Sequence, residues 1–272
     1  MRWTQRAADA AVLLVLAAYA VPFFWQLLTS FKPDALLLQL PPLVPAELTT
    51  AHYQAVWSKS LIPRALANSL AVAALTTALA LAIGLSGAYA LARLPVPGTN
   101  ALLLALVAGT AFPQIAIVSP LYLLIRALGL RDTWSALVLA NTSFALPLVI
   151  WLLAGFIREI PPELEEAAAL DGAGRRQIIL RIVAPLVAPA MASVGLLAFL
   201  ASWNEFLFAY TFTATESSRT VPVALALFPG VFEVPWGDIA AASILASVPP
   251  ILIVIGLQRF LVRGLLAGAV RE

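Results

Sequence analysis

Six apolar runs, each about as long as a lipid bilayer is thick and nearly free of charged residues, constrain this chain more than any other feature. They lie near residues 9–30, 65–92, 100–125, 134–157, 186–210 and 239–260. A helix needs about 20 apolar residues to cross the hydrocarbon core, and each run supplies them. The composition agrees, because 62% of the residues are hydrophobic and only 11% are charged. We predict an all-α membrane protein with six transmembrane helices in a single domain, residues 1–272.

The first apolar run leaves a choice between a cleaved signal peptide and a retained anchor. Arg2 and Arg6 precede the run, and Ala18-Tyr19-Ala20 resembles a cleavage site. The apolar character continues through residues 21–28, which makes the segment long enough to stay in the membrane. We expect a retained anchor, with cleavage as the alternative.

The distribution of basic residues predicts the orientation. An even number of spans places both termini on one side, which also carries most of the basic residues: Arg2, Arg6, Arg93, Arg158, Arg175, Arg176, Arg181, Arg259, Arg263 and Arg271. The other side carries Lys32, Lys59, Arg64, Arg126, Arg131 and Arg219. Because cytoplasmic loops are enriched in Lys and Arg, we expect both termini in the cytoplasm.

Several kinds of chemistry find no support in the sequence. No G-x-x-x-x-G-K-[ST] loop is present to cradle ATP, and the chain has no cysteine. The single histidine, His52, has no companion ligands, so we expect no metal site and no catalytic trio, and assign it to a surface or to loop packing in an external loop. The net charge is +2, but the basic residues are scattered, so no nucleic-acid partner is expected.

Prolines and glycines interrupt the third and fourth runs. Gly109, Pro113, Pro120 and Pro147 are tolerated in a membrane only where neighbouring helices, hydroxyl groups or water satisfy the freed backbone groups. We therefore expect these helices to face protein or a cavity. The apolar but short segment 221–232, which is broken by prolines, is expected to be an external interfacial or re-entrant piece.

A charged segment at about residues 158–185 is predicted to form a cytoplasmic helix-turn-helix. Pro161-Pro162 suits a helix start, an acidic first turn complements the positive end of the helix, and Asp171-Gly172 signals a turn. Leu164, Ala167 and Ala168 form a narrow apolar stripe that allows a partner to approach closely. The alternative is a pair of amphipathic helices on the membrane surface, with Arg175, Arg176 and Arg181 binding anionic lipid.

This segment resembles the cytoplasmic signature of permease subunits of binding-protein-dependent ABC importers. Glu166-Ala167-Ala168, Gly172, Ile182 and Pro185 carry the resemblance, and Ala184 stands where the family usually has leucine. The resemblance extends to Phe31-Lys32-Pro33, Pro95-Val96-Pro97-Gly98, Trp203-Asn204-Glu205-Phe206, Gly129-Leu130-Arg131-Asp132-Thr133-Trp134, Phe144-Ala145-Leu146-Pro147-Leu148 and the stretch 264–270. These motifs are similar to the carbohydrate class, specifically six-span permeases of the maltose and trehalose type.

The resemblance implies a type I ABC importer permease in a prokaryotic inner membrane. Such a chain is a transport subunit and not an enzyme, binds no cofactor itself and leaves ATP and Mg to separate subunits. Its implied partners are a second permease in a heterodimer, two ATP-binding subunits, an extracytoplasmic sugar-binding protein and membrane lipid. An α-glucoside disaccharide such as trehalose or maltose is the implied cargo. The residues implied to couple to the ATPase are Glu163, Glu165, Glu166, Ala167, Ala168, Asp171 and Gly172.

Polar residues inside the apolar runs are candidates for a sugar pathway. Trp203-Asn204-Glu205 offers an aromatic face and hydrogen-bonding groups, and Asn141 and Gln114 lie in other runs. An ionisable residue within a span is by default functional. In the alternative, Asn204 and Glu205 satisfy broken backbone or pair with a sister subunit, and Asn68 and Asn141 form interhelical hydrogen bonds.

Three other functions compete with the sugar permease. An ion-coupled secondary transporter would show inverted repeats and carboxylates at mid-membrane, and neither is evident in the sequence. A membrane-embedded enzyme would need a catalytic cluster. An ABC permease for a non-sugar solute is the third alternative.

Overall fold

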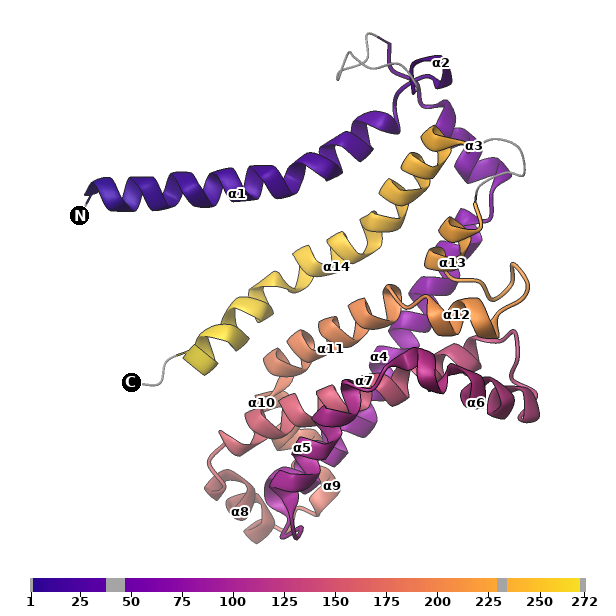
Figure 1. Cartoon of the computed structure of the whole chain (residues 1–272). Coiled ribbons are helices and arrows are strands. Elements are labelled where there is room, and N and C mark those ends of the chain that lie inside the picture. Colours follow the sequence, from indigo (N-terminus) through magenta and orange to yellow (C-terminus); the bar gives the residue numbers. More distant parts are fainter. Residues whose placement is uncertain (1, 38–46, 229–233, 270–272) are drawn as a thin grey trace. The chain divides into compact units, whose positions relative to one another are not determined.

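The computed structural model describes residues 2–37, 47–228 and 234–269, and this part of the chain contains helices and no strand. Figure 1 labels the elements. They are α1 (Arg2–Thr29), α2 (Asp34–Leu37), α3 (Ala51–Lys59), α4 (Ile62–Arg93), α5 (Thr99–Thr110), α6 (Gln114–Ala127), α7 (Trp134–Arg158), α8 (Glu163–Leu170), α9 (Arg175–Ile178), the π-helix η1 (Ile179–Val183), α10 (Ala184–Leu186), α11 (Ala188–Trp203), α12 (Leu207–Phe212), α13 (Val221–Ala226) and α14 (Trp236–Ala269).

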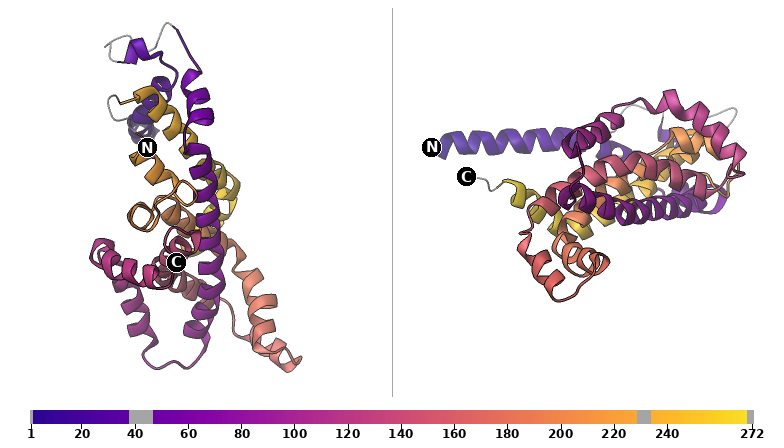
Figure 2. Two further views of the ribbon diagram at one scale, coloured as in Figure 1. Left: turned by 90° about the vertical axis from the view of Figure 1, so that its right-hand side faces the viewer. Right: turned by 90° about the horizontal axis from the view of Figure 1, so that it is seen from below.

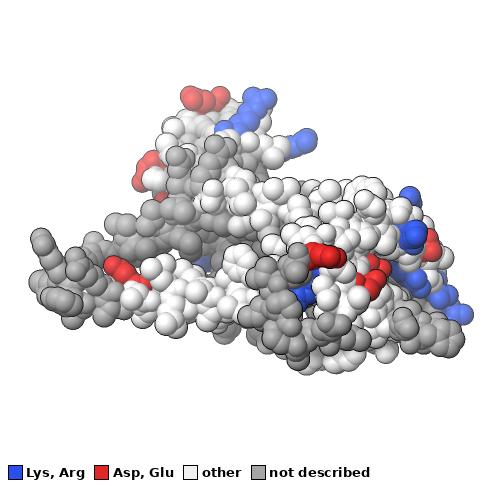
Figure 3. Space-filling view, turned by 90° about the horizontal axis from the view of Figure 1, so that it is seen from above, with Lys and Arg blue, Asp and Glu red and all other residues white. Residues whose placement is uncertain are grey.

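Four of the predicted membrane spans are single helices in the structure. The segments long and apolar enough to cross a bilayer are Asp9–Thr29, Ile62–Arg93, Trp134–Arg158 and Trp236–Gln258. Their bounds lie within three residues of the predicted ones. Long apolar runs predict the presence of a helix more reliably than they predict its first and last residues. The all-α membrane fold is therefore confirmed for these segments. Figure 3 shows broad uncharged surface between small groups of charged side chains, as expected for such a protein.

The third and fifth predicted spans are not single straight helices. Instead of one run over 100–125, α5 and α6 meet at an angle of 91°. The run 186–210 is divided into α11 and α12, and the pair Arg175–Leu186 and Ala188–Trp203 bends by 82° at the start of that run. Pro113 precedes α6 with extended backbone, and it has no N–H to continue α5. The described residues hold up to six spans if each bent pair counts as one, so the number of crossings stays a prediction.

The structure divides into two compact units, which are described separately. Unit 1 comprises Met1–Pro63 and Ala224–Val248, and unit 2 comprises Arg64–Val223 and Pro249–Glu272. The prediction of one domain over residues 1–272 is not tested by this division. The motif at 264–270 ends at Val270, and the segment 221–232 includes 229–232; these positions lie outside the described residues.

In unit 2, α7 is the central helix and packs against both α5 and α11. One apolar cluster joins α4, α5, α7 and the segment from α9 to α11, and it includes Leu85, Leu153, Ile157 and Val183. Gly84 allows α4 to approach α7 closely, because a Cβ atom there would collide with Val149. A second cluster is centred on Phe208 and Phe212 and joins α12 to α6 and α7. These contacts fix the helices that carry the candidate site.

In unit 1, His52 is the point where three segments meet. Its ring is buried, with Nδ1 2.7 Å from Oδ1 of Asp238 and Nε2 2.9 Å from the carbonyl oxygen of Lys32. His52 thus connects α3 with the residues that follow α1 and with the first turn of α14. The loop-packing role predicted for His52 is what the structure shows, although the ring is buried and not on the surface. Gly237 leaves room for the ring.

Candidate functional site

The charged segment 158–185 folds as the predicted helix-turn-helix. Pro162 precedes α8, the acidic residues Glu163, Glu165 and Glu166 occupy its first turn, and Asp171 follows its last residue. Gly172 has φ of +84°, a left-handed conformation that glycine adopts without strain. A second helix starts at Arg175, as predicted. Figure 2 shows α8 and α9 at the same end of unit 2 as the connection between α4 and α5.

One residue of the predicted coupling set, Glu165, faces the interior of the chain. The residue as a whole is 8% exposed, and Oε1 accepts a hydrogen bond of 2.7 Å from Nε of Arg93. The hydroxyl of Tyr89 donates to Oε2 over 2.8 Å. Arg93 also donates to the carbonyl oxygen of Ile160 over 2.5 Å. Glu165 therefore anchors α8 to α4, a contact that the sequence did not indicate.

The remaining residues of the set lie on the outer face of the loop. Glu163, Glu166, Ala167, Asp171 and Gly172 are exposed, and Ala168 is partly buried against the core of unit 2. Leu164 and Leu170 are 47% and 91% exposed. An exposed leucine beside small residues and carboxylates is a surface that a complementary partner can cover. The partner contact of these residues stays a prediction.

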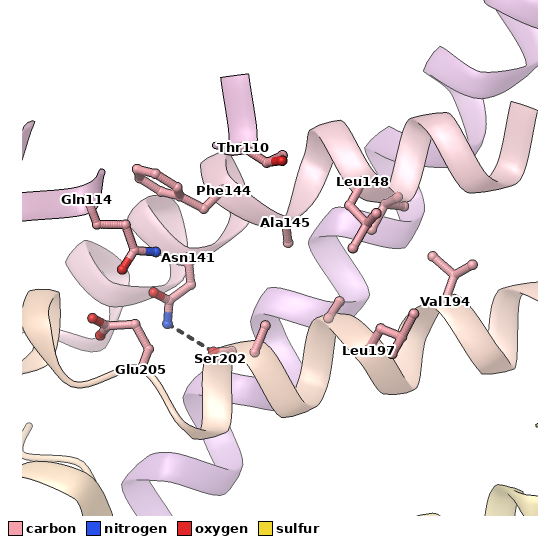
Figure 4. A pocket seen from close by; sticks show the side chains of 13 residues that line it. Thr110, Gln114, Asn141, Phe144, Ala145, Leu148, Val194, Leu197, Ser202 and Glu205 are labelled. Carbon is pink, nitrogen blue, oxygen red and sulfur yellow. Dashed lines mark hydrogen bonds between the residues drawn. The ribbon is translucent and has the colours of Figure 1, made fainter. Parts of the chain in front are cut away.

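A small cavity in unit 2 lies between α7 and α11, and it is also lined from the junction of α5 with α6. Its lining comprises Thr110, Gln114, Asn141, Phe144, Ala145, Leu148, Val149, Val194, Leu197, Ala198, Ala201, Ser202 and Glu205. Figure 4 shows Gln114, Asn141 and Glu205 gathered at one end, with Leu148, Val194 and Leu197 toward the other. The cavity therefore has one polar and one apolar end.

Three of the five predicted pathway residues line this cavity, and two do not. Gln114, Asn141 and Glu205 are part of its wall. Trp203 is buried and stacks on Phe199 at a ring distance of 5.8 Å, and Asn204 donates to the carbonyl oxygen of Leu200 in its own helix. The sequence prediction missed Thr110, Ser202 and Phe144. The helix breaks at Pro113 and the polar triplet at 203–205 could have pointed to the first two, which lie close by in the chain.

Glu205 lines the cavity and also caps the start of α12. Its Oε1 accepts from the backbone N–H of Phe208 over 2.6 Å, and Oε2 accepts from that of Ala209 over 3.0 Å. Carboxylates accept such bonds at helix starts because the first N–H groups have no partner within the helix. The predicted run 186–210 is therefore divided into α11 and α12. The contacts of Glu205 therefore agree with the alternative prediction, in which its carboxylate accepts hydrogen bonds from backbone groups at a helix break.

Asn141 is the most constrained polar residue of the wall. It is 7% exposed, and Nδ2 donates to the hydroxyl of Ser202 over 2.9 Å. Its Oδ1 is buried and has no hydrogen-bond partner among the described residues. An unpaired buried acceptor costs about 1–3 kcal/mol, so this oxygen favours a donor group beside it.

Two helix breaks of unit 2 open onto this cavity. Thr110 ends α5, Gln114 begins α6, and Glu205 lies between α11 and α12. Irregular backbone within a membrane segment is tolerated where it lines a cavity, and interrupted helices commonly build solute sites in transporters. The cavity volume is about 170 Å³. Pockets that hold small molecules usually have about 300–1,000 Å³, so this cavity alone is not a complete disaccharide site.

Outside the apolar segments, Asp132 holds two loops of unit 2 together. Its carboxylate accepts from the backbone N–H groups of Ala214 and Thr215 and from the hydroxyls of Thr215 and Ser218. Partial burial alone would raise the pKa of the Asp132 carboxyl, but these donors outweigh it and hold the pKa well below its usual range. From α4, Nδ2 of Asn68 donates to the carbonyl oxygens of Glu216 and Arg219. These bonds fix the loop around residues 214–219.

Metal ligands are not gathered in the part of the chain that the structure describes, since no group of three His, Asp or Glu side chains there could hold an ion.

Comparisons with known proteins agree with these features. Residues 80–267 match the family described as "Binding-protein-dependent transport system inner membrane component". The chain is 41% identical over 271 residues, 98% of both chains, to the trehalose transport system permease protein SugB of Mycobacterium tuberculosis. It is 37% identical over 96% of both chains to the trehalose/maltose transport system permease protein MalG of Thermococcus litoralis. The fold is similar to that of a chain in the crystal structure of a bacterial ABC transporter for alginate import, with a TM-score of 0.77, 22% identity and coverage of 93% and 95% of the two chains.

Proposed function

Because the chain belongs to the family of binding-protein-dependent transport system inner membrane components, we propose that it is the permease subunit of an ATP-driven importer of a carbohydrate. We propose an α-glucoside disaccharide, trehalose or maltose, as the cargo. The observation that carries the choice is 41% identity over 98% of the chain to a trehalose permease. The proposed partners are a second permease, two ATPase subunits and an extracytoplasmic sugar-binding protein in a prokaryotic inner membrane.

The loop around α8 is the proposed contact with the ATPase. Its exposed face combines the carboxylates of Glu163 and Glu166, the small side chain of Ala167 and the apolar side chain of Leu170. Asp171 and Gly172 set the turn that presents this face, and Ala168 packs beneath it. In the opposing proposal, that this loop lies on lipid headgroups, the exposed carboxylates of Glu163 and Glu166 would meet the anionic membrane surface.

The cavity is the proposed part of the solute pathway that this chain supplies. A sugar needs donors and acceptors for its hydroxyls and an apolar face for its ring carbons. Gln114 and the amide of Asn141 supply the first, and Leu148 and Leu197 supply the second. No Lys or Arg lines the cavity, and Glu205 brings a carboxylate, so a neutral sugar fits this wall better than an acidic solute.

Uptake by vesicles tests the proposed function. The purified chain should be reconstituted with the second permease, the ATPase and the binding protein, and supplied with labelled trehalose, maltose or a non-sugar solute. We expect ATP-dependent uptake of one of the two disaccharides, and no ATP hydrolysis by the chain alone. Uptake driven by a proton gradient without ATP would favour a secondary transporter, and uptake of only the non-sugar solute would overturn the choice of cargo.

Asn141→Ala tests the pathway in the same vesicles. It removes a cavity amide and should lower the apparent affinity for the sugar by about fivefold, the factor of one neutral hydrogen bond. Asn204→Ala removes an amide of the same type that lies outside the cavity wall and should change affinity less. Equal effects of the two variants would contradict the proposed pathway.

Labelling of single cysteines tests the proposed orientation, in which both termini and α8 are cytoplasmic and α3 is external. The chain has no native cysteine, which leaves no background. Ser58 and Arg176 are exposed, whereas His52 is too buried to label cleanly. Cysteine at position 58 should react with an impermeant reagent from outside, and cysteine at position 176 only after the membrane is opened. Labelling of both from outside would contradict the orientation.

A further inference from the structure

Two polar contacts on α4, one at its end and one in its middle, have no place in the function proposed above. The first is the anchor defined by Glu165, Arg93, Tyr89 and Ile160. Tyr89 and Arg93 are four residues apart and so lie on one face of α4. Together they bind both oxygens of the Glu165 carboxylate, while Arg93 also binds the carbonyl oxygen of Ile160, just before the Pro161-Pro162 pair. The start of the loop and the first turn of α8 are thus bound to one guanidinium.

The anchor is shielded from water. The side chains of Arg93 and Glu165 are 15% and 10% exposed, and Tyr89 is 6% exposed. Ala168 and Ala173 pack against the same apolar cluster as Tyr89 and Leu91. A shielded ion pair with a further hydrogen bond on each partner holds its geometry much better than an exposed pair, which solvent and salt weaken. α8 and the end of α4 are therefore held together rigidly within unit 2.

The second contact joins the same helix to the cavity. Thr76 is fully buried on α4, and its Oγ1 is 3.4 Å from the hydroxyl of Ser202. Ser202 in turn accepts from Nδ2 of Asn141 over 2.9 Å, and both residues line the cavity. Between Thr76 and Arg93, α4 is an uninterrupted helix of unit 2, about 26 Å long at 1.5 Å per residue.

We propose that α4 transmits movement between the loop around α8 and the cavity, with Glu165, Arg93 and Tyr89 as positioning residues at one end and Thr76 with Ser202 at the other. The proposal rests on the proposed function, since it assumes that an ATPase moves α8. A displacement of α8 pulls on Arg93 and Ile160, α4 shifts along its axis, and Thr76 changes the position of Ser202 and Asn141. The solute contact is thereby linked to the nucleotide state of the partner.

Glu165→Gln is the main test, measured as sugar uptake per ATP hydrolysed in the complete reconstituted complex. The amide keeps the shape of the carboxylate but loses its charge, so the bond to Arg93 weakens. We expect assembly and hydrolysis to continue while uptake per ATP falls about tenfold, the factor of a hydrogen bond to a charged group. Glu159→Gln is the matched control, because Glu159 is exposed and close in sequence, and its ratio should not change. An unchanged ratio in an assembled Glu165→Gln complex would overturn the proposal.

Tyr89→Phe tests the proposal if the Glu165→Gln chain does not assemble with its partner subunits. It leaves the Arg93 pair in place and removes one hydroxyl, so the chain should still fold. The expected result is a smaller fall in the same ratio, about fivefold for one hydrogen bond. Uptake per ATP at the level of the unaltered chain would contradict a positioning role for the anchor.

A double variant tests whether the two contacts act through one helix. Thr76→Val keeps the side-chain shape and removes the hydroxyl that faces Ser202. If α4 links the contacts, Glu165→Gln combined with Thr76→Val should lower uptake per ATP no further than the stronger single variant, because either break disconnects the helix. Reductions that multiply would show two independent roles and overturn the link. Failure of the unaltered chain to bind an ATPase would instead refute the proposed function.

Discussion

Glu165 and Glu205 are both withdrawn from water, but the structure stabilises their carboxylates in different ways. Glu165 is held by a guanidinium and a phenol from α4, which are 72 and 76 residues away in the chain. Glu205 is held by backbone N–H groups only three and four residues ahead. The first carboxylate therefore fixes one element against another, whereas the second fixes the start of one helix. Loss of the first should affect communication, and loss of the second should affect the local fold and the cavity wall.

The largest expected effect is on stability, in Glu205→Ala. The variant leaves the N–H groups of Phe208 and Ala209 without their acceptor at the start of α12, which packs in the core of unit 2. We expect a loss of about 2–4 kcal/mol, and about half of that in Glu205→Gln, which keeps one acceptor oxygen. Thermal unfolding of the detergent-solubilised chain measures both. Equal stability of Glu205→Ala and the unaltered chain would mean that the carboxylate serves the pathway alone.

The cytoplasmic loop was more predictable from sequence than the cavity. Pro161-Pro162 and Asp171-Gly172 are local signals, and they gave the bounds of α8 and the positive φ of Gly172. Local signals also explain why Gln114 and Glu205 were expected near a pathway. The anchor of Glu165 could not be predicted, because its partners are distant in sequence. The sequence also does not indicate which glutamate of the acidic turn faces the interior.

The break between α11 and α12 was equally hidden in the sequence. No proline or glycine occurs in residues 203–207, so hydropathy gave one continuous run. The break depends on a side chain that competes for backbone N–H groups, which periodicity does not reveal. Phe144 was missed for a related reason, since a phenylalanine in an apolar run has no signature until the neighbouring helix is placed.

An intermediate effect is expected from Gly172→Ala, which tests whether the loop needs its turn as well as its anchor. The conformation at φ +84° costs a non-glycine residue about 1–2 kcal/mol. No atom lies within 4 Å of the added Cβ, so the cost comes from the backbone and not from a collision. We expect weaker association with the ATPase in co-purification, and a stronger loss in Gly172→Val.

Gly174→Ala is the matched control for the turn. Gly174 has φ of −71° and ψ of 159°, which any residue can adopt, and its Cβ would meet only Gln177 at 4.0 Å. This variant should bind the ATPase as the unaltered chain does. If Gly172→Ala and Gly174→Ala bind equally well, the shape of the turn does not matter for the contact.

The smallest effect concerns a third carboxylate, Asp238 of unit 1, whose cationic partner can lose its charge. Both ring nitrogens of His52 face acceptors, Asp238 and the carbonyl oxygen of Lys32, and Asp34 lies 3.9 Å from Nε2, an arrangement that suits the doubly protonated ring. Burial alone would lower the pKa of His52, but these hydrogen bonds and the two carboxylates outweigh it and raise the pKa above its ordinary value. The Lys32 ammonium lies over the Trp25 ring, 4.9 Å from its centre.

A raised pKa in the folded state means that His52 contributes stability at acidic pH, which is fully present below the pKa of the unfolded chain and is lost as the pH rises through the folded pKa. We therefore expect the unfolding temperature of the chain to fall as the pH rises from the ordinary histidine pKa of 6.5 through the raised pKa of His52 in the folded chain. His52→Gln, which cannot titrate, should flatten this part of the profile. Glu165→Gln breaks the Arg93 pair of unit 2 but leaves His52 in place, so it should lower stability without changing the slope. A slope that persists in His52→Gln would assign the pH dependence to another group and remove this contrast between the two ion pairs.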